Sequence, residues 1–171
     1  MQKIILIGFM GSGKTSIAKI LSENMKLDFI DTDKRIEANQ NQSINEIFAN
    51  HGENFFRTLE TKTLEEILKE KKSAVIATGG GLPIRDENQT LLKKMGKVIY
   101  LRATTDTIYQ RIKDDNSRPL LNTPDPRQKI RDLLEERTPI YERIADFIID
   151  TDNKPLEQII DEILFDLKLI C

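Results

Sequence analysis

A glycine-rich loop near the start of the chain carries the strongest chemical signal. Residues Gly8–Thr15 have the sequence GFMGSGKT, which fits the phosphate-binding pattern G-x-x-x-x-G-K-[ST] between an apolar run and a helical segment. Glycines let successive backbone N–H groups point into one concavity, and the positive end of the following helix also attracts an anion. Lys14 is then placed to reach the β and γ phosphates, and Thr15 to bind a bridging Mg²⁺. The loop predicts a nucleoside triphosphate site but leaves the phosphate acceptor open.

Two carboxylates at the end of a second apolar run are candidates for the acceptor side. Asp31 and Asp33 are two residues apart, and in extended geometry both side chains point to one face. One is then expected near the metal, while the other accepts a hydrogen bond from an acceptor hydroxyl. The alternative is that Asp33 only caps a helix beginning at Lys34.

Glycines and arginines complete the set of candidate ligand-binding residues. Gly79–Gly81 end a third apolar run, where backbone amides can contact a ligand closely, although a flexible turn is the alternative. Arg57, Arg118 and Arg137 each lie near a break in the pattern. A guanidinium binds a carboxylate or a phosphoryl group through two parallel hydrogen bonds, but any single arginine is more often a solvated surface charge.

These residues need a scaffold that brings them to one edge. Short apolar runs alternate with longer segments of helical period, the pattern of βα units in a parallel sheet. Five strands are expected, at Lys3–Gly8, Asp28–Asp31, Ala74–Thr78, Lys97–Leu101 and Phe147–Asp150. Helices are expected over Lys14–Met25, from Ser43 toward Phe48, and over Asn54–Lys71, Asp86–Met95, Thr105–Lys113, Arg127–Arg143 and Pro155–Lys168. Pro139 should kink or divide the helix that contains it.

One segment, Asp114–Pro126, interrupts this alternation. It combines three prolines with turn-forming polar residues and has no steady apolar face, which predicts a loop. Because a structureless stretch of this length inside a compact domain is more often functional than not, we expect it to be a mobile lid over a site.

The composition limits the class of protein. The 171 residues, 39% hydrophobic and 32% charged, are typical of one soluble domain spanning residues 1–171. With 26 Lys and Arg against 28 Asp and Glu, no overall positive field attracts nucleic acid or an anionic membrane, so an anion site must be local. The only cysteine, Cys171, allows no intrachain disulfide and is compatible with a reducing cytoplasm. The longest apolar run, Ile4–Met10, is far shorter than the ~20 residues of a membrane-spanning helix.

Together the motifs carry a resemblance to a known family. The sequence resembles the shikimate kinases, within the nucleoside monophosphate kinase group of P-loop proteins, nearly from end to end. The matching residues are Gly8–Thr15, Asp31, Thr32, Asp33, Ser43–Phe48, Gly52, Glu53, Phe56, Arg57, Glu60, Gly79–Gly81, Arg118–Leu121, Arg137 and Tyr141. The resemblance implies a three-layer α/β/α P-loop kinase fold with a five-stranded parallel sheet, an acceptor-binding region at about residues 32–60 and a lid at about residues 112–124.

On the nucleotide side, the resemblance implies that Lys14 and Arg118 act at the phosphates, with Arg118 brought in by the lid. Arg111 and Pro155 would form the walls of the adenine site. The full implied set of ATP-binding residues is Gly11, Ser12, Gly13, Lys14, Thr15, Ser16, Arg111, Arg118 and Pro155. Thr15 and Asp31 would hold Mg²⁺, Asp31 through water.

On the acceptor side, the resemblance implies that Asp33 either positions or deprotonates the attacking hydroxyl. Arg57 and Arg137 would clamp a carboxylate. Gly79, Gly80 and Gly81 would contact the other hydroxyls. One departure from many relatives is Lys34, which stands where they carry an apolar residue and forms part of the wall of this pocket.

The function implied by the resemblance is transfer of the ATP γ-phosphate to the 3-hydroxyl of shikimate, giving shikimate 3-phosphate and ADP, with Mg²⁺, in chorismate and aromatic amino acid biosynthesis. The expected partners are ATP and shikimate, without nucleic acid or membrane, for a cytoplasmic monomer. Two alternatives stay open. A gluconate or nucleotide kinase would share the P-loop and lid without needing the same aspartates, arginines and glycines, and a nucleotide-binding regulatory module would need no acceptor site.

Overall fold

The sheet is built from five short segments that are apolar in the sequence. In the computed structural model, which describes residues 3–114 and 123–168, they form β1 (Lys3–Ile7), β2 (Asp28–Asp31), β3 (Ala74–Ala77), β4 (Gly96–Arg102) and β5 (Phe147–Asp150). Every ladder is parallel and the strand order is β2-β3-β1-β4-β5. The carboxyl ends therefore meet at one edge, and the predicted five-stranded parallel sheet is confirmed, with strand ends within about one residue of those expected.

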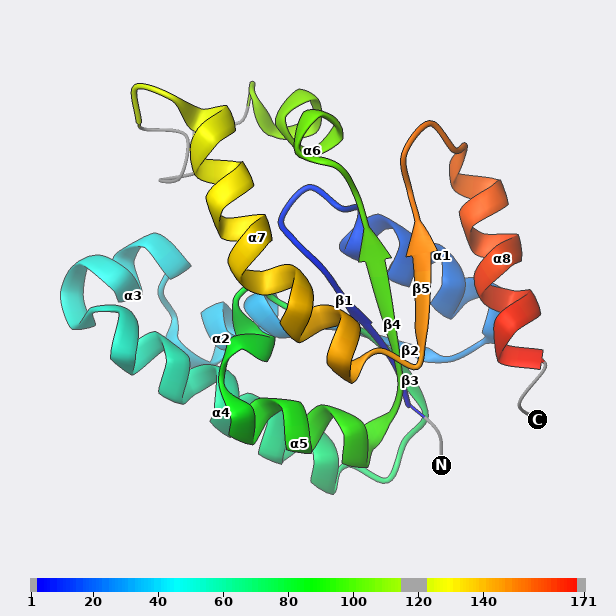
Figure 1. Cartoon of the computed structure of the whole chain (residues 1–171). Coiled ribbons are helices and arrows are strands. Elements are labelled where there is room, and N and C mark those ends of the chain that lie inside the picture. Colours follow the sequence, from blue (N-terminus) through cyan, green and yellow to red (C-terminus); the bar gives the residue numbers. More distant parts are fainter. Residues whose placement is uncertain (1–2, 115–122, 169–171) are drawn as a thin grey trace.

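Helices connect the strands and cover both faces of the sheet (Figure 1). They are α1 (Lys14–Met25), α2 (Thr32–Gln40), α3 (Ile44–His51), α4 (Glu53–Lys69), α5 (Asp86–Met95), α6 (Thr105–Ile112), α7 (Pro126–Ile144) and α8 (Leu156–Lys168), with a short 3₁₀ turn η1 (Leu82–Ile84). Helices α1 and α8 pack on one face, and α4, α5 and α7 pack on the other. The arrangement is the predicted three-layer α/β/α fold.

The central strand β1 shows why the sheet needs both layers. Its residues are all buried, and successive side chains point to opposite faces. Ile4 and Leu6 belong to the core shared with α1 and α8, whereas Ile5 and Ile7 belong to the core shared with α4, α5 and α7. A strand that is apolar at every position is therefore buried on both sides, as parallel sheets require.

Helix α2 corrects one local expectation about the two aspartates. The extended conformation ends at Asp31, and Thr32 already begins the helix, so Asp31 and Asp33 do not share the face of a strand. The alternative, in which Asp33 caps a helix that begins at Lys34, names the wrong residue as the cap. Asp31 is the N-cap, because its Oδ1 accepts the backbone N–H groups of Asp33 at 3.1 Å and Lys34 at 3.2 Å.

Helix α7 contains Pro139 without being divided. The helix is continuous from Pro126 to Ile144, so the expectation that the proline divides it was wrong. The predicted lid at residues 112–124 lies between α6 and α7, and its central residues, 115–122, fall outside the described residues. The loop and its proposed motion therefore remain a prediction.

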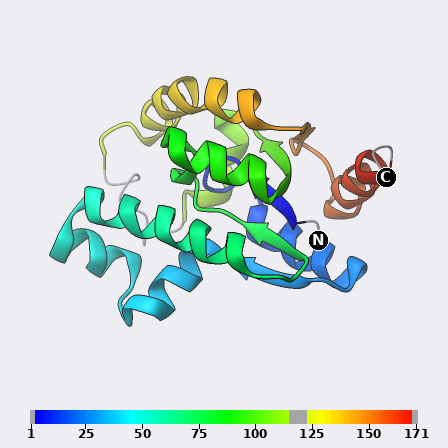
Figure 2. The ribbon, with the colours of Figure 1, turned by 90° about the horizontal axis from the view of Figure 1, so that it is seen from below.

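The segment from α2 to the start of α4 has a small core of its own. Ile36, Ile47, Phe56 and Leu59 form a separate apolar cluster. Figures 1 and 2 show α3 projecting beyond the end of the sheet, next to the first turns of α4. This projecting part coincides with the region predicted to bind the acceptor.

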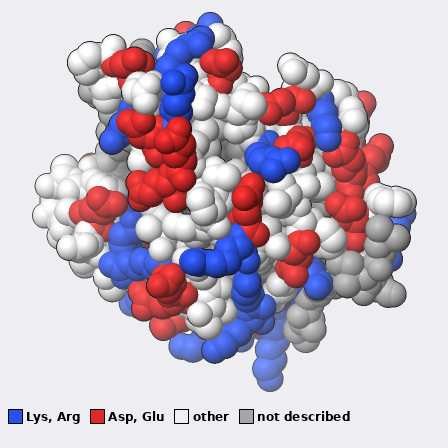
Figure 3. Space-filling model, in the orientation of Figure 1, with Lys and Arg blue, Asp and Glu red and all other residues white. Residues whose placement is uncertain are grey.

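The surface drawn in Figure 3 carries both signs of charge. Lys and Arg side chains alternate with Asp and Glu over this face, in keeping with the net charge of −2. Among the described residues, no helix is both long enough and apolar enough to span a membrane.

Candidate active site

The glycine-rich loop connects β1 to α1 at the carboxyl edge of the sheet. Gly8 has φ 143°, and a Cβ atom there would lie 2.6 Å from the carbonyl oxygen of Leu101 on the neighbouring strand. Gly13 precedes α1 with φ 94°, a conformation that favours glycine. No side chain caps the start of α1, so the backbone N–H groups of its first turn are available to an anion. The loop has the local geometry of a phosphate cradle.

Lys14 lies over this cradle. Its side chain is buried, and Nζ donates hydrogen bonds to the carbonyl oxygens of Gly8 and Phe9, each at 2.8 Å. Ser12 is buried beside it, with its hydroxyl oxygen 3.5 Å from Lys14 Nζ. The positive charge is therefore held within the loop, where phosphate oxygens would bind.

Thr15 and Asp31, the predicted metal-binding pair, lie together although the local geometry around Asp31 differs from expectation. Thr15 Oγ1 donates to Asp31 Oδ2 at 3.0 Å. A hydroxyl and a carboxylate are the hard oxygen donors that Mg²⁺ prefers, and Mg²⁺ commonly takes its remaining ligands from water and substrate phosphates. In the described part of the chain, no group of three or more His, Cys, Asp or Glu could hold a metal.

Asp33 points its carboxylate at the glycine triplet. A Cβ atom on Gly79 would lie 2.6 Å from Asp33 Oδ1, so this oxygen rests directly on the glycine. Thr32 holds the triplet from the same helix, since its hydroxyl accepts the N–H of Gly79 at 3.0 Å. Asp33 Oδ1 is buried and has no hydrogen-bond partner among the residues that the structure describes. Burial, helped by the negative charge of Asp31, raises the pKa of Asp33 to about 6, against the lowering effect of Lys14.

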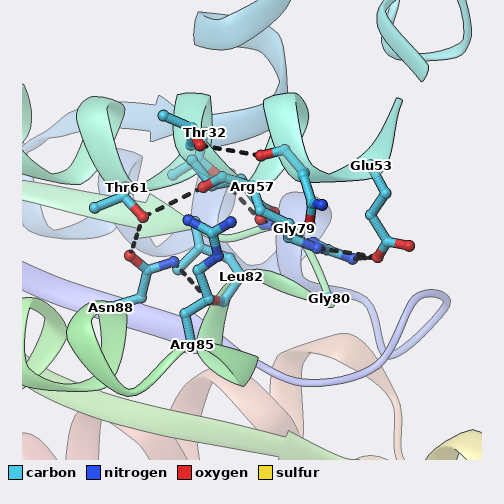
Figure 4. A network of polar contacts seen from close by, with 12 residues as sticks. Thr32, Glu53, Arg57, Thr61, Gly79, Gly80, Leu82, Arg85 and Asn88 are labelled. Atoms are coloured by element: carbon cyan, nitrogen blue, oxygen red, sulfur yellow. Dashed lines mark hydrogen bonds and ion pairs between the residues drawn. The ribbon is translucent and has the colours of Figure 1, made fainter. Parts of the chain in front are cut away.

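Arg57, on α4, lies beside the glycine triplet (Figure 4), with its guanidinium at the Gly81 end. A Cβ atom on Gly81 would lie within 2.8 Å of three guanidinium atoms of Arg57. The guanidinium is held by two carboxylates of its own helix: Nη1 donates to Glu60 Oε2 at 2.8 Å and Nη2 to Glu53 Oε1 at 3.0 Å. Arg57 is thus fixed in place before any acceptor binds.

Glu60 is the residue whose place in the site the sequence did not reveal. It belongs to the matching motif, but no role was assigned to it. The structure buries its side chain to 1% exposure and leaves Oε1 without a hydrogen-bond partner among the described residues. The Cβ atom on Gly79 that would meet Asp33 Oδ1 would also lie 3.2 Å from Glu60 Oε1. Its spacing of three residues from Arg57 on a helix was the available signal.

Helix α7 brings Arg137 and Tyr141 to the same edge. The guanidinium of Arg137 lies 5.5 Å from the ring centre of Phe9 in the phosphate-binding loop, and its Nε is buried without a partner among described residues. Tyr141, one turn later and fully buried, donates its hydroxyl to the carbonyl oxygen of Gly80 at 2.6 Å. Burial raises the pKa of Tyr141, so the hydroxyl stays a donor.

The residues predicted for the adenine side are only partly brought together. Arg111 donates to the carbonyl oxygen of Gly11 at 3.1 Å and to that of Thr151, after β5, at 3.1 Å. It therefore links the phosphate-binding loop to the segment that leads to Pro155, which is exposed just before α8. Ser16 is exposed in the first turn of α1. Arg118 lies outside the described residues, and the adenine-binding roles remain predictions.

The arrangement places a loop with the geometry of a phosphate cradle next to a buried carboxylate and two arginines. Gly80 joins the two halves, because a Cβ atom there would lie 3.3 Å from the backbone nitrogen of Met10 and 3.4 Å from the carbonyl oxygen of Gly8. Such a site can hold a phosphoryl donor on one side and an anionic, hydroxyl-bearing molecule on the other.

Comparison with known proteins agrees with this geometry. The family model "Shikimate kinase" matches residues 10–168. Shikimate kinase of Thermodesulfovibrio yellowstonii is 43% identical over 164 residues, covering 96% of this chain and 94% of that protein, and the Sulfurihydrogenibium enzyme is 43% identical over 168 residues, covering 98% and 99%. The solved structure of shikimate kinase from Acinetobacter baumannii in complex with shikimate superposes with a TM-score of 0.92 at 38% identity, over 98% of this chain and 93% of that one. The chain therefore belongs to the shikimate kinase family and is a phosphotransferase of that kind.

Proposed function

We propose that the protein transfers the γ-phosphoryl group of ATP to the 3-hydroxyl of shikimate. The observation that carries this proposal is the buried Oδ1 of Asp33, which rests on a glycine turn that also faces Arg57 and adjoins the phosphate-binding loop. An ionised carboxylate in that place can accept a hydrogen bond from an alcohol. The Acinetobacter relative, solved in complex with shikimate, supports the choice of acceptor.

The reaction proposed is an in-line displacement. The acceptor oxygen bonds to the γ-phosphorus as the bond to the ADP oxygen breaks, and the hydroxyl proton passes to Asp33 Oδ1. Because its pKa is about 6, Asp33 is mostly ionised near neutral pH and can take this proton. Lys14 and the N–H groups of the first turn of α1 hold the phosphates in line.

Thr15 and Asp31 are the residues that would hold Mg²⁺. When bound, the ion offsets the charge of the phosphate oxygens. Arg57 and Arg137 are proposed to orient the acceptor by its carboxylate, which fixes one hydroxyl beside Asp33. Arg118 is proposed to reach the phosphates from the lid.

The single cysteine fits a cytoplasmic location, and we propose a single-domain monomer, which light scattering can test.

A coupled assay of ADP formation tests the proposal. With ATP and Mg²⁺, ADP should form rapidly with shikimate and only slowly with gluconate, a nucleoside monophosphate or no acceptor. Mass spectrometry should then find shikimate 3-phosphate. Equal ADP formation with and without shikimate would favour the regulatory nucleotide-binding module, and preference for gluconate would favour the other kinase class.

A further inference from the structure

Glu60 is a buried acid whose two oxygens have different surroundings. Oε2 accepts a hydrogen bond from Arg57 Nη1 at 2.8 Å, whereas Oε1 is buried and has no partner within the described part of the chain. Oε1 faces the space in front of Gly79, close to Asp33 Oδ1. A buried carboxylate oxygen without a donor is costly, and a proton on that oxygen lowers the cost because it removes the buried charge.

The charges that face Glu60 come from three parts of the fold. Arg57 lies on the same helix, Asp33 approaches from α2, and Arg85 reaches in from the segment between η1 and α5 (Figure 4). Burial raises the pKa of Glu60 to about 7, and Asp33 raises it further in the same direction, while Arg57 and Arg85 lower it. Among these groups Arg57 lowers the pKa most, because it is both the hydrogen-bond donor and the nearest positive charge.

An anionic acceptor changes this balance. In the proposed function, the acceptor's carboxylate binds Arg57, which already contacts the carboxylates of Glu53 and Glu60. The new negative charge offsets the guanidinium that stabilises ionised Glu60, and it enters a space from which the acceptor displaces water. The carboxylates of Asp33, Glu60 and the acceptor would then lie close together, with few positive charges to stabilise all three.

We propose that Glu60 binds a proton on Oε1 when the acceptor binds, so that the site takes up its anionic acceptor together with a proton. This inference rests on the proposed function, because it requires a carboxylate at Arg57. Oε2 keeps its hydrogen bond to Arg57, while the protonated Oε1 becomes a donor in the space it shares with Asp33. When Glu60 is neutral, it no longer offsets the positive charge of Arg57, so that charge attracts the acceptor's carboxylate more strongly. Glu60 is therefore a positioning residue that acts through Arg57.

Linkage gives the observable consequence. A ligand that prefers the protonated protein must take up protons when it binds, and its affinity must fall as the pH rises through the range in which the free protein loses that proton. For Glu60 this range lies around neutral pH. Shikimate affinity should thus weaken by up to about tenfold between about pH 6 and about pH 8.

Calorimetry of shikimate binding in buffers with different ionisation enthalpies measures the protons taken up. At about pH 8 the wild-type protein should take up close to one proton per shikimate, and fewer at about pH 6. Glu60→Gln keeps the shape but cannot ionise, so uptake should vanish and the affinity should no longer depend on pH. Glu53→Gln is the matched control, because Glu53 contacts the same guanidinium from an exposed position. It should keep the wild-type uptake even if the affinity changes.

The outcomes separate this inference from the proposed function. Absence of uptake by the wild-type protein at about pH 8, or equal uptake by Glu60→Gln, overturns the inference while leaving shikimate as the acceptor. Loss of uptake in both variants also overturns it, because the proton then follows the arginine rather than Glu60.

A second measurement does not need the variant to fold. Titration of the unliganded wild-type protein with ¹³C-labelled glutamate carboxyls should show one glutamate that loses its proton near pH 7. A spectrum of the shikimate-bound protein in which every glutamate is ionised at about pH 8 would overturn the inference on its own. Failure of shikimate to bind, with that titration present, would instead reject the proposed function.

Discussion

The triplet Gly79–Gly81 leaves room for the side chains of Asp33, Arg57 and Glu60 to lie close together. A side chain at either end of the triplet would displace them. At Gly79 the added atom would meet the carboxylate of Asp33, and at Gly81 it would meet the guanidinium of Arg57. The charged groups thus use space that only glycine leaves free. At the scale of single residues, the site is defined as much by missing side chains as by those present.

Replacing Asp33 by Asn should separate chemistry from nucleotide binding. The amide keeps the shape but cannot accept the hydroxyl proton, so turnover should fall by about 10²- to 10⁴-fold. Calorimetry with a non-hydrolysable ATP analogue should show nearly unchanged affinity, since the proposed phosphate site is the loop before α1. A collapse of ATP affinity with turnover preserved at saturating ATP would place Asp33 on the nucleotide side.

Gly81→Ala should weaken acceptor binding selectively. The backbone of Gly81 has φ −87°, which alanine adopts without strain, so the effect comes from the new Cβ displacing the Arg57 guanidinium. We expect KM for shikimate to rise by about tenfold, as for loss of one good charge-assisted hydrogen bond, with KM for ATP unchanged. Equal changes in both KM values would mean that the turn itself is disrupted.

At the scale of elements, two helices connect the halves of the site. Helix α2 is capped by Asp31, which also accepts a hydrogen bond from the hydroxyl of Thr15 in α1. Helix α7 carries Arg137, which lies beside Phe9. It also holds the glycine triplet in place, because the Tyr141 hydroxyl donates a hydrogen bond to the carbonyl oxygen of Gly80. Each helix therefore has a contact that stabilises the fold and a proposed role in ligand binding, and substitutions can separate the two.

Asp31→Asn and Asp31→Ala should separate the cap from the metal site. Asparagine is as good an N-cap as aspartate, so Asp31→Asn should melt near the wild-type temperature, whereas Asp31→Ala should lose about 1 kcal/mol. Both should require more Mg²⁺ for half-maximal turnover, because both lose the carboxylate beside Thr15. Unchanged Mg²⁺ dependence in both variants would leave Asp31 with the capping role alone.

Tyr141→Phe removes the hydroxyl that holds Gly80. The lost hydrogen bond should cost about 1 kcal/mol of unfolding free energy, and the loosened triplet should lower kcat/KM for shikimate. Tyr100→Phe is the matched control, because the two rings pack together at 5.0 Å but only the Tyr141 hydroxyl contacts the triplet. A kinetic effect of equal size in Tyr100→Phe would mean that loss of either hydroxyl has this effect and that the contact with Gly80 is not its cause.

At the scale of the whole molecule, the burial of Glu60 makes stability depend on pH. The pKa of Glu60 is about 7 in the folded protein and near its ordinary 4.5 when unfolded, so folding favours the protonated form. Its favourable contribution is complete below pH 4.5 and is lost as the pH rises through 7. Glu60→Gln should therefore gain stability relative to the wild type from about pH 5 to about pH 8, by up to about 3 kcal/mol.

Denaturant unfolding of the unliganded proteins across this pH range measures the difference. Glu53→Gln, altered at the exposed carboxylate of the same arginine, should show no comparable trend. A constant difference between Glu60→Gln and the wild type at all pH values would contradict the buried, proton-binding role.

The sequence predicted the sheet and the phosphate-binding loop because both depend on local patterns. The buried strands are continuous apolar runs, and the loop is a contiguous motif. Helix α2 was expected only in the alternative interpretation of Asp33, since TDKRIEANQ buries only Thr32 and Ile36 and has little apolar periodicity. Glu60 could not be placed from the sequence either, because its burial depends on Gly79, which is close only after β3 and α4 pack together. Local pattern determines the elements, whereas tertiary packing determines these contacts.

The separate cluster of Ile36, Ile47, Phe56 and Leu59 has a consequence for divergence within this fold. Because these side chains pack mainly with one another, the segment that carries them can change in length and composition without rebuilding the strands or the nucleotide loop. New alcohol substrates can then arise by remodelling an outlying module while the phosphoryl-donor machinery is inherited intact. Exchanging residues 32–60 between kinases that prefer different acceptors would make the same kind of change by protein engineering.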